Sequence, residues 1–148
     1  MFSFLPKKTP GYPTESRWSV LNGEHNGLPL IVRRNESARR LRGHPDYVHR
    51  VGVAIALHEG DSRGLPAQAE IDMLNQIEDA LVNALEANQD SLQVLAVMTN
   101  AMREFVFYTR VPRQIEARIK HVQQQFRSYE LQFYVAEDAQ WEGFTQFG

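Results

Sequence analysis

The sequence contains no cysteine and no long apolar run. Without cysteine among its 148 residues, the chain cannot form disulfides, zinc–thiolate sites or a cysteine nucleophile. No apolar stretch approaches the roughly 20 residues with which a helix spans a bilayer. The first residues, Met1 to Pro13, do not have the order of basic and apolar residues that is typical of a signal peptide. We therefore expect a cytoplasmic protein.

The sequence also lacks an excess of positive charge. It has 16 Lys and Arg residues against 18 Asp and Glu residues, which gives a formal net charge of −2 and a pI of about 6.2. Proteins that bind duplex nucleic acid usually carry a basic field, because neutralised phosphates supply most of their affinity. Nucleic acid is therefore not an expected partner, and neither is a membrane.

Common catalytic motifs are missing as well. There is no nucleophile elbow, phosphate-binding loop, dinucleotide fingerprint or zinc-binding histidine pair. His49 and His58 are nine residues apart on one predicted strand, so they face opposite sides and do not predict a shared metal site. Glu59 and Asp61 follow a strand end, where catalytic groups are common, but nothing in the sequence there indicates a raised pKa. We expect no metal and no cofactor, and we favour a non-enzymatic role while leaving an enzyme open.

The composition predicts one packed domain preceded by a short arm. Hydrophobic residues make up 43% of the chain, which is enough for a core. Residues 1–14 are rich in proline and form the predicted arm, and residues 15–148 form the domain. Phe2, Phe4 and Leu5 could anchor the arm on its own domain or on a neighbouring subunit, the alternative being a frayed tail.

Sequence patterns predict an N-terminal β-hairpin followed by the order strand, helix, strand, strand, helix, strand. Asn-Gly pairs between two strand-forming segments indicate the hairpin. The later strands are expected at 47–59, 91–99, 103–109 and 130–136, the helices at 67–88 and 112–127, and a short terminal helix at 137–144. This order is that of a ferredoxin-like α+β fold, in which both helices lie on one face of the sheet.

The strand "REFVFYT" has aromatic residues that could bind bases or fill a core. The RNA-recognition motif shares this element order and stacks bases on aromatics of its third strand. Here Glu104 and Val106 stand where that motif has small residues, and the first core strand offers only alanines as partners. We therefore expect Phe105 and Phe107 to point toward the helices.

The sheet face without helices, which we call the open face, should be small and semi-apolar. Side chains alternate along a strand, which places the following residues on this face: Gly52, Ala54, Ala56, Leu95, Val97, Glu104, Val106, Tyr108 and Tyr134. A monomer seldom leaves such a face in water. We expect a second subunit, the N-terminal arm or a ligand to cover it, so a homodimer or another protein partner is the predicted interaction.

Arginines near the strand ends are the best candidates for a ligand site. Arg33 and Asn35 end the hairpin, Arg103 and Glu104 begin the aromatic strand, and Tyr108 lies near its other end. Arg33 and Arg103 could hold a carboxylate or phosphate through paired hydrogen bonds. These five residues form the candidate ligand-binding cluster, and no catalytic residue is predicted.

Two functions are compatible with these patterns. The favoured one is a non-catalytic protein-interaction or regulatory module, because catalytic motifs are missing and the open face is semi-apolar. The alternative is a small-molecule-binding protein or enzyme that uses the Arg/Glu/Tyr cluster on the open face, with anionic metabolites as ligands. Ion pairs of Arg33 or Arg103 with Glu104 or Asp138 inside the chain would instead leave the arginines with a structural role.

Four segments in a fixed order resemble a known family. They are Trp18, "GLPLIVRRN", "REFVFY" and "DAQW", and together they resemble the domain of unknown function 695 family, an uncharacterised bacterial group, over residues 16 to 145. The family has no established activity, so the resemblance implies no substrate. One departure is Asn100-Ala101-Met102 before Arg103, where a glycine is expected in the turn. A fainter similarity to regulator protein B, the ribonuclease E inhibitor, implies an adaptor that binds an enzyme.

Overall fold

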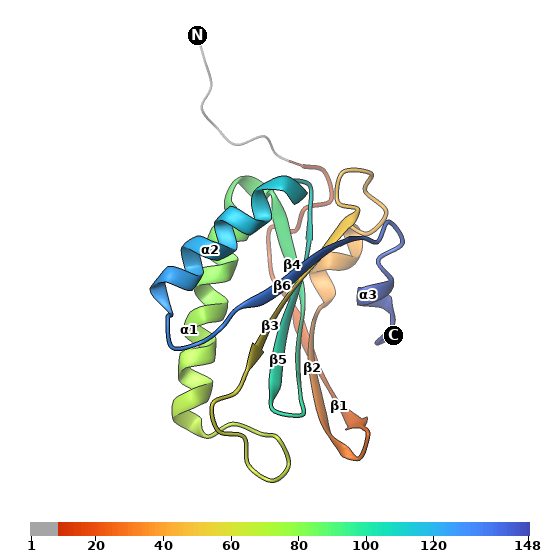
Figure 1. Ribbon diagram of the computed structural model, residues 1–148. Coiled ribbons are helices and arrows are strands. Elements are labelled where there is room, and N and C mark those ends of the chain that lie inside the picture. Colours follow the sequence, from red (N-terminus) through yellow and green to blue (C-terminus); the bar gives the residue numbers. More distant parts are fainter. Residues whose placement is uncertain (1–8) are drawn as a thin grey trace.

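The computed structural model describes residues 9–148, which form an α+β fold with one six-stranded antiparallel sheet (Figure 1). Phe2, Phe4 and Leu5, the expected anchors of the arm, lie outside the described residues. The strands follow the order β1-β2-β4-β5-β3-β6. They are β1 (Trp18–His25), β2 (Leu28–Asn35), β3 (His49–Ala56), β4 (Ser91–Thr99), β5 (Met102–Thr109) and β6 (Gln132–Glu137).

In the described part of the chain, three α-helices and three 3-10 turns accompany these strands, and the last helix follows the final strand. The helices are α1 (Gln68–Leu85), α2 (Ile115–Gln125) and α3 (Glu142–Thr145), and the turns are η1 (Glu36–Arg40), η2 (Ala87–Gln89) and η3 (Pro112–Gln114). The predicted elements are all present, with shifted ends. Among the described residues, no helix is long and apolar enough to cross a membrane.

Positive backbone φ angles explain both hairpin turns. Asn26 and Gly27 join β1 to β2 with φ angles of 53° and 78°, as the Asn-Gly pair predicts. Asn100 and Ala101 join β4 to β5 with φ angles of 50° and 58°. The second turn thus needs the left-handed conformation at both positions although neither is glycine. Loop contacts hold it, since the N–H of Leu57 donates to the carbonyl of Ala101 at 2.9 Å.

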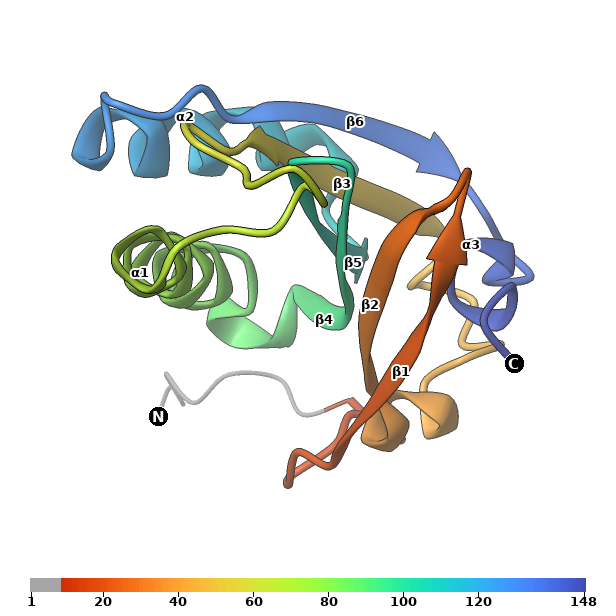
Figure 2. The same ribbon diagram turned by 90° about the horizontal axis from the view of Figure 1, so that it is seen from below.

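The main core lies between the sheet and the helices α1 and α2, which cover one face (Figure 2). Phe105 and Phe107 are fully buried in this core, which confirms their predicted direction. Val51, Val53 and Ile55 of β3 point the same way. The two rings bury roughly 150–250 Å² each, so they contribute to the fold and are not available to stack on bases.

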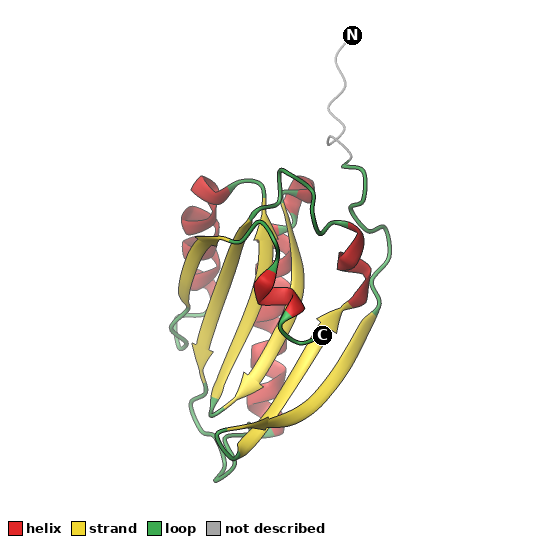
Figure 3. Ribbon diagram, turned by 90° about the vertical axis from the view of Figure 1, so that its right-hand side faces the viewer, coloured by secondary structure: helices red, strands yellow, loops and turns green. Residues whose placement is uncertain are grey.

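The open face is partly covered by the C-terminal segment of the same chain, which is not among the expected occupants, namely a second subunit, the arm or a ligand. Tyr108 and Val106 are buried under Trp141 and Phe144 of the C-terminal segment. Figure 3 shows α3 lying against this face over part of the sheet. The rings of Tyr108 and Trp141 stack with centroids 4.1 Å apart. The uncovered part contains Ala54, Ala56, Val97 and Tyr134, which remain half-buried or exposed.

Candidate functional site

The five residues of the predicted ligand-binding cluster do not share one face of the sheet. Arg33, Asn35 and Arg103 are on the helix-facing side, whereas Glu104 and Tyr108 are on the open face. The separation follows from strand geometry, because consecutive side chains such as those of Arg103 and Glu104 point to opposite sides. The open face therefore does not hold the Arg/Glu/Tyr cluster as a single unit.

The two arginines of that cluster differ in their partners. Arg33 forms an ion pair with Glu78 of α1, with Nη2 and Oε2 2.5 Å apart. Arg33 therefore has an intramolecular partner, although this partner is Glu78 and not the expected Glu104 or Asp138. Arg103 is more isolated: burial lowers the pKa of its guanidinium, and its Nε is buried without a hydrogen-bond partner among the described residues.

A pocket of about 380 Å³ lies beside α1, on the helix-facing side, and we call it the α1 pocket. Its walls come from the segment before β1, from β1 and β2, from α1 and from β4. The lining residues are Tyr12, Pro13, Thr14, Glu15, Ser16, Trp18, Arg33, Asn35, Glu78, Asp79, Val82, Glu86, Leu92 and Gln93. Its volume falls in the usual range for small-molecule sites, about 300–1,000 Å³, and two of the five predicted residues line it.

One face of α1 supplies the acidic wall of the α1 pocket. Glu78, Val82 and Glu86 recur every four residues, so they lie in one row along the helix. Ile77, Leu81 and Leu85 form the neighbouring row, which is buried in the main core. The helix therefore separates an apolar row for the core from a row with two carboxylates for the pocket.

Gln93 of β4 holds both of these carboxylates. Its side-chain Nε2 donates to Oε2 of Glu78 at 2.7 Å, and its backbone N–H donates to Oε2 of Glu86 at 2.8 Å. The pairing of β4 with β5 shifts register between Gln93 and Leu95, and such bulges redirect side chains. No hydrogen bond among the described residues ends on Oε1 of Glu78 or Oε1 of Glu86. Each carboxylate therefore has one oxygen available for a ligand.

The surroundings of Glu86 disfavour the ionised form of its carboxyl. Burial raises the pKa of its carboxyl, and the hydrogen bond from Gln93 offsets this only in part. Glu86 is also the C-cap residue of α1, where the helix dipole disfavours a negative charge. Glu78, in contrast, has the guanidinium of Arg33 beside it, which in turn lies 5.5 Å from the ring centroid of Trp18.

The α1 pocket is acidic as a whole. Glu15, Glu78, Asp79 and Glu86 line it, and Arg33 is the single basic residue in the lining. Neither histidine nor cysteine lines it, and so the pocket does not offer the nucleophile and base pair of the common hydrolases. The arrangement suits the binding of a group with positive charge.

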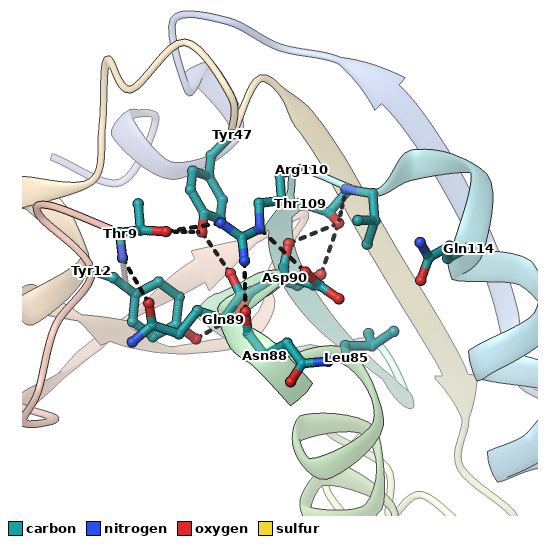
Figure 4. Close-up of polar contacts among 12 residues, drawn as sticks. Thr9, Tyr12, Tyr47, Leu85, Asn88, Gln89, Asp90, Thr109, Arg110 and Gln114 are labelled. Atoms are coloured by element: carbon teal, nitrogen blue, oxygen red, sulfur yellow. Dashed lines mark hydrogen bonds and ion pairs between the residues drawn. The ribbon is translucent and has the colours of Figure 1, made fainter. Parts of the chain in front are cut away.

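A polar network at one end of the sheet fixes the segment that forms the outer wall of the pocket (Figure 4). The N–H of Thr9 donates to the side chain of Gln89 at 3.0 Å, and Arg110 donates to the hydroxyl of Thr9 at 2.9 Å. The hydroxyl of Tyr12 donates to the carbonyl of Ser91 at 2.7 Å. The part of the predicted arm from residue 9 onward therefore packs on the domain.

The same network surrounds Asp90 and a strained turn. Asp90 accepts from Arg110 at 3.2 Å and from Arg118 at 2.7 Å. Asn88 and Gln89 have φ angles of 59° and 60°, a conformation that non-glycine residues adopt at a cost. Their carbonyls accept hydrogen bonds from Arg110 and from the hydroxyl of Tyr47, which stabilises the turn. All of these hydrogen-bond and ion-pair partners belong to the chain itself, which indicates that the network around Asp90 has a structural role.

On the open face, Asp138 joins the C-terminal segment to the sheet. Its carboxylate accepts from the Tyr108 hydroxyl at 2.6 Å, from Arg50 at 3.0 Å, and from the N–H groups of Glu142 and Gly143 at 2.8 and 2.9 Å. Burial alone would raise the pKa of Asp138, but these hydrogen bonds and the Arg50 charge lower it below its usual range. Tyr108, a predicted ligand residue, therefore has a structural partner.

The histidine-rich segments lie apart from the α1 pocket. His44 accepts a hydrogen bond from the backbone N–H of Asp46. The ring of His58 stacks on Tyr129 with centroids 3.9 Å apart, and its Nε2 contacts the carbonyl of Ser128. Within residues 9–148, no group of three metal-ligating side chains comes together.

Sequence reasoning missed the residues that shape the α1 pocket most. Glu78 and Glu86 were part of the predicted helix, and their spacing of eight with Val82 between them was a usable signal. Gln93 was not identifiable, because its role depends on the β4 bulge. The sequence singles out Trp18 only through the family resemblance.

Comparisons with known proteins agree with the resemblance found in the sequence. No curated protein and no solved structure matches the chain, and the fainter similarity to regulator protein B has no support in them. A family model described as "Family of unknown function (DUF695)" matches residues 16–147. That match spans the four segments that carry the resemblance and most of the chain. The protein therefore belongs to the family of unknown function DUF695.

Proposed function

We propose that this protein is a non-catalytic binding module whose α1 pocket takes a cationic group, an ammonium or a guanidinium. The observation that carries the proposal is the pair of carboxylates held by Gln93. Glu78 and Glu86 each use one oxygen for Gln93 and keep the other for a ligand. Hydrogen bonds between a carboxylate and a cationic donor are among the strongest in proteins.

The aromatic residues of the pocket support the same ligand class. Tyr12 lines the pocket beside the acidic row, and the ring of Trp18 already holds the guanidinium of Arg33 at 5.5 Å, because aromatic faces attract ammonium and guanidinium groups. A bound cation would also stabilise the ionised form of Glu86, which burial disfavours in the free protein. Anionic metabolites, the ligands expected for the sequence-predicted cluster, would meet four carboxylates in this pocket.

The cationic group could belong to a free amine or to a lysine or arginine side chain of a protein. Both sources share the same chemistry, and the second retains the regulatory role favoured by the sequence. A thermal-shift series with putrescine, agmatine, a blocked lysine peptide and citrate separates them. Ligand at 100 times Kd should stabilise the fold by about 2.7 kcal/mol. We expect a response to one of the cationic probes and none to citrate.

Two matched variants locate the response. Glu86→Gln should remove it, because the variant loses a carboxylate of the α1 pocket. Glu104→Gln should keep it, because Glu104 lies on the open face, where it accepts from Tyr134. A protein that shows no stabilisation by any cation, or a Glu86→Gln variant that responds like the parent, would rule out the proposal.

A protein-interaction role through the sheet is the second candidate, and one observation favours it. The open face keeps an uncovered part with the small residues Ala54, Ala56 and Val97, and the neighbouring edge strand β6 exposes Phe133 and Tyr134.

We further propose that β3 to β6, with α1 and α2, follow the ferredoxin-like path, with the β1–β2 hairpin added beside β4. The order β4-β5-β3-β6 supports this assignment.

A further inference from the structure

The edge strand β6 has an unpaired side. It pairs with β3 along its inner side, and no other backbone hydrogen bond reaches it from the described residues. Figure 2 shows β6 at the outside of the sheet. An edge strand presents a row of free N–H and C=O groups, which proteins usually protect with lysine, proline, a bulge or an inward-pointing charge. The strand β6, QFYVAE, has no lysine, proline or bulge, and its one charged residue, Glu137, is exposed at its end.

Aromatic side chains are exposed on both sides of this edge. Phe133, on the helix-facing side, is 36% exposed, and Tyr134, on the open face, is 41% exposed. The ring of Tyr134 is held in place: its hydroxyl donates to Glu104 at 3.0 Å, and the guanidinium of Arg50 lies 5.7 Å from its centroid. The ring lies across Gly52, where a Cβ atom would come within 2.2 Å of it. The structure thus fixes an exposed tyrosine at the middle of a free edge.

We propose that a second copy of this chain pairs with β6 antiparallel to the first, about a two-fold axis at Tyr134. The two sheets then form one continuous sheet. The partner is a second copy and not an unrelated strand, because β6 is complementary to itself in a single register.

Sheet geometry selects that register. A two-fold axis perpendicular to a sheet keeps each face on its own side, and directly opposite residues share a face. Tyr134 therefore faces Tyr134 of the second copy, Phe133 faces Val135, and Gln132 faces Ala136. All members of these pairs are uncharged. In the Tyr134 register, Glu137 lies opposite Leu131, the residue just before β6 begins. Moving the axis to Val135 would instead place Phe133, inside the strand, against the carboxylate of Glu137, and moving it to Phe133 would leave much of β6 unpaired.

Disulfide trapping tests the register directly, because the natural chain has no cysteine. Tyr134→Cys puts the two sulfurs opposite each other at the axis, within reach of a disulfide. Gln132→Cys faces Ala136, and Val20→Cys lies on β1 at the other edge of the sheet, where Val20 is 57% exposed. On a non-reducing gel, we expect Tyr134→Cys to form the covalent dimer at least about tenfold faster than either control. Equal rates for all three would overturn the proposal.

Sedimentation equilibrium of the unmodified chain supplies a second measurement. We expect the mass of two chains at about 100 μM, a concentration that populates a dimer of micromolar Kd. Tyr134→Lys should give the mass of one chain, because two like charges would meet at the axis, while Val20→Lys should leave the dimer intact. Circular dichroism checks that each variant is folded. A single-chain mass for the parent protein would also overturn the proposal, without bearing on the α1 pocket.

Discussion

Replacing Glu86 by glutamine should make the protein more stable at neutral pH. The substitution removes a negative charge from the C-cap of α1 and from a half-buried position, and it keeps an oxygen for the N–H of Gln93. The charge at the helix end costs about 0.3–1 kcal/mol, and partial burial of the same charge, which raises the pKa of the carboxyl, acts in the same direction. We expect a gain of about 1–2 kcal/mol at pH 7, or roughly 3–6 °C in Tm for a chain of this size.

The pH dependence has a definite sign. The pKa of Glu86 is higher in the folded chain than in the unfolded chain, so above about pH 4.3 the unfolded state loses this proton first. The free energy of unfolding of the parent then falls as pH rises through this window, up to the folded pKa. Below the window both states hold the proton, so the advantage of Glu86→Gln should be larger at pH 7 than at pH 4, where it should nearly vanish.

Urea unfolding at pH 4 and pH 7 measures both effects, with two carboxylates as comparisons. Glu78→Gln should lower the free energy of unfolding by about 1–3 kcal/mol, because Arg33 loses its partner. Glu130 is exposed, so Glu130→Gln should stay within about 0.5 kcal/mol of the parent. If Glu86→Gln destabilised the fold at pH 7, or if its gain persisted at pH 4, the view of Glu86 as a disfavoured charge would fail.

Three further substitutions test other parts of the fold by urea unfolding. Ala101→Gly should raise the free energy of unfolding by about 0.5–1 kcal/mol, because Ala101 has a φ of 58° and glycine adopts this conformation without strain; a loss would contradict the assigned turn. Asp138→Asn should cost about 2–3 kcal/mol at neutral pH, because Arg50 and Tyr108 lose a carboxylate partner. The hydrogen bonds lower the pKa of Asp138, so its contribution is present above about pH 4 and is lost as pH falls through the folded value; an unchanged difference at low pH would contradict this. Gly143→Ala should cost about 1–3 kcal/mol, because a Cβ would lie 2.5 Å from Cδ of Arg50, and an unaffected protein would show that Arg50 can move aside.

The stabilising direction expected for Glu86→Gln bears on function. A charged residue that lowers the free energy of unfolding, at a position where an uncharged side chain would raise it, is not there for stability. Binding sites commonly contain such residues. Glu86 lines the α1 pocket and keeps one oxygen free of internal hydrogen bonds among the described residues. The same substitution should therefore raise stability and abolish cation binding, a combination that a purely structural role does not produce.

Local sequence patterns predicted the helices and strands well, because these elements arise from the spacing of residues that are close together in the sequence. Alternation along β5 correctly placed Phe105 and Phe107 against the helices, and four-residue spacing identified α1. The same alternation argued against the predicted ligand cluster, since Arg103 and Glu104 are consecutive and must face opposite sides. What was beyond local reasoning depends on contacts distant in sequence. The C-terminal segment covers the open face because Trp141 stacks on Tyr108, and no periodic pattern reveals such a contact.

The sheet order relates the two proposals to each other. The α1 pocket is walled by β1, β2 and β4, whereas the proposed dimer forms through β6 at the opposite edge. A second copy paired with β6 would therefore leave both pockets open, and a cation in the pocket would make no contact that differs between monomer and dimer. Without a differential contact there is no coupling free energy between the two equilibria. Cation affinity should accordingly be the same for the parent and for Tyr134→Lys in calorimetric titrations. A dependence of affinity on the oligomeric state would show instead that the change at β6 reaches α1 through the core formed by Phe105 and Phe107.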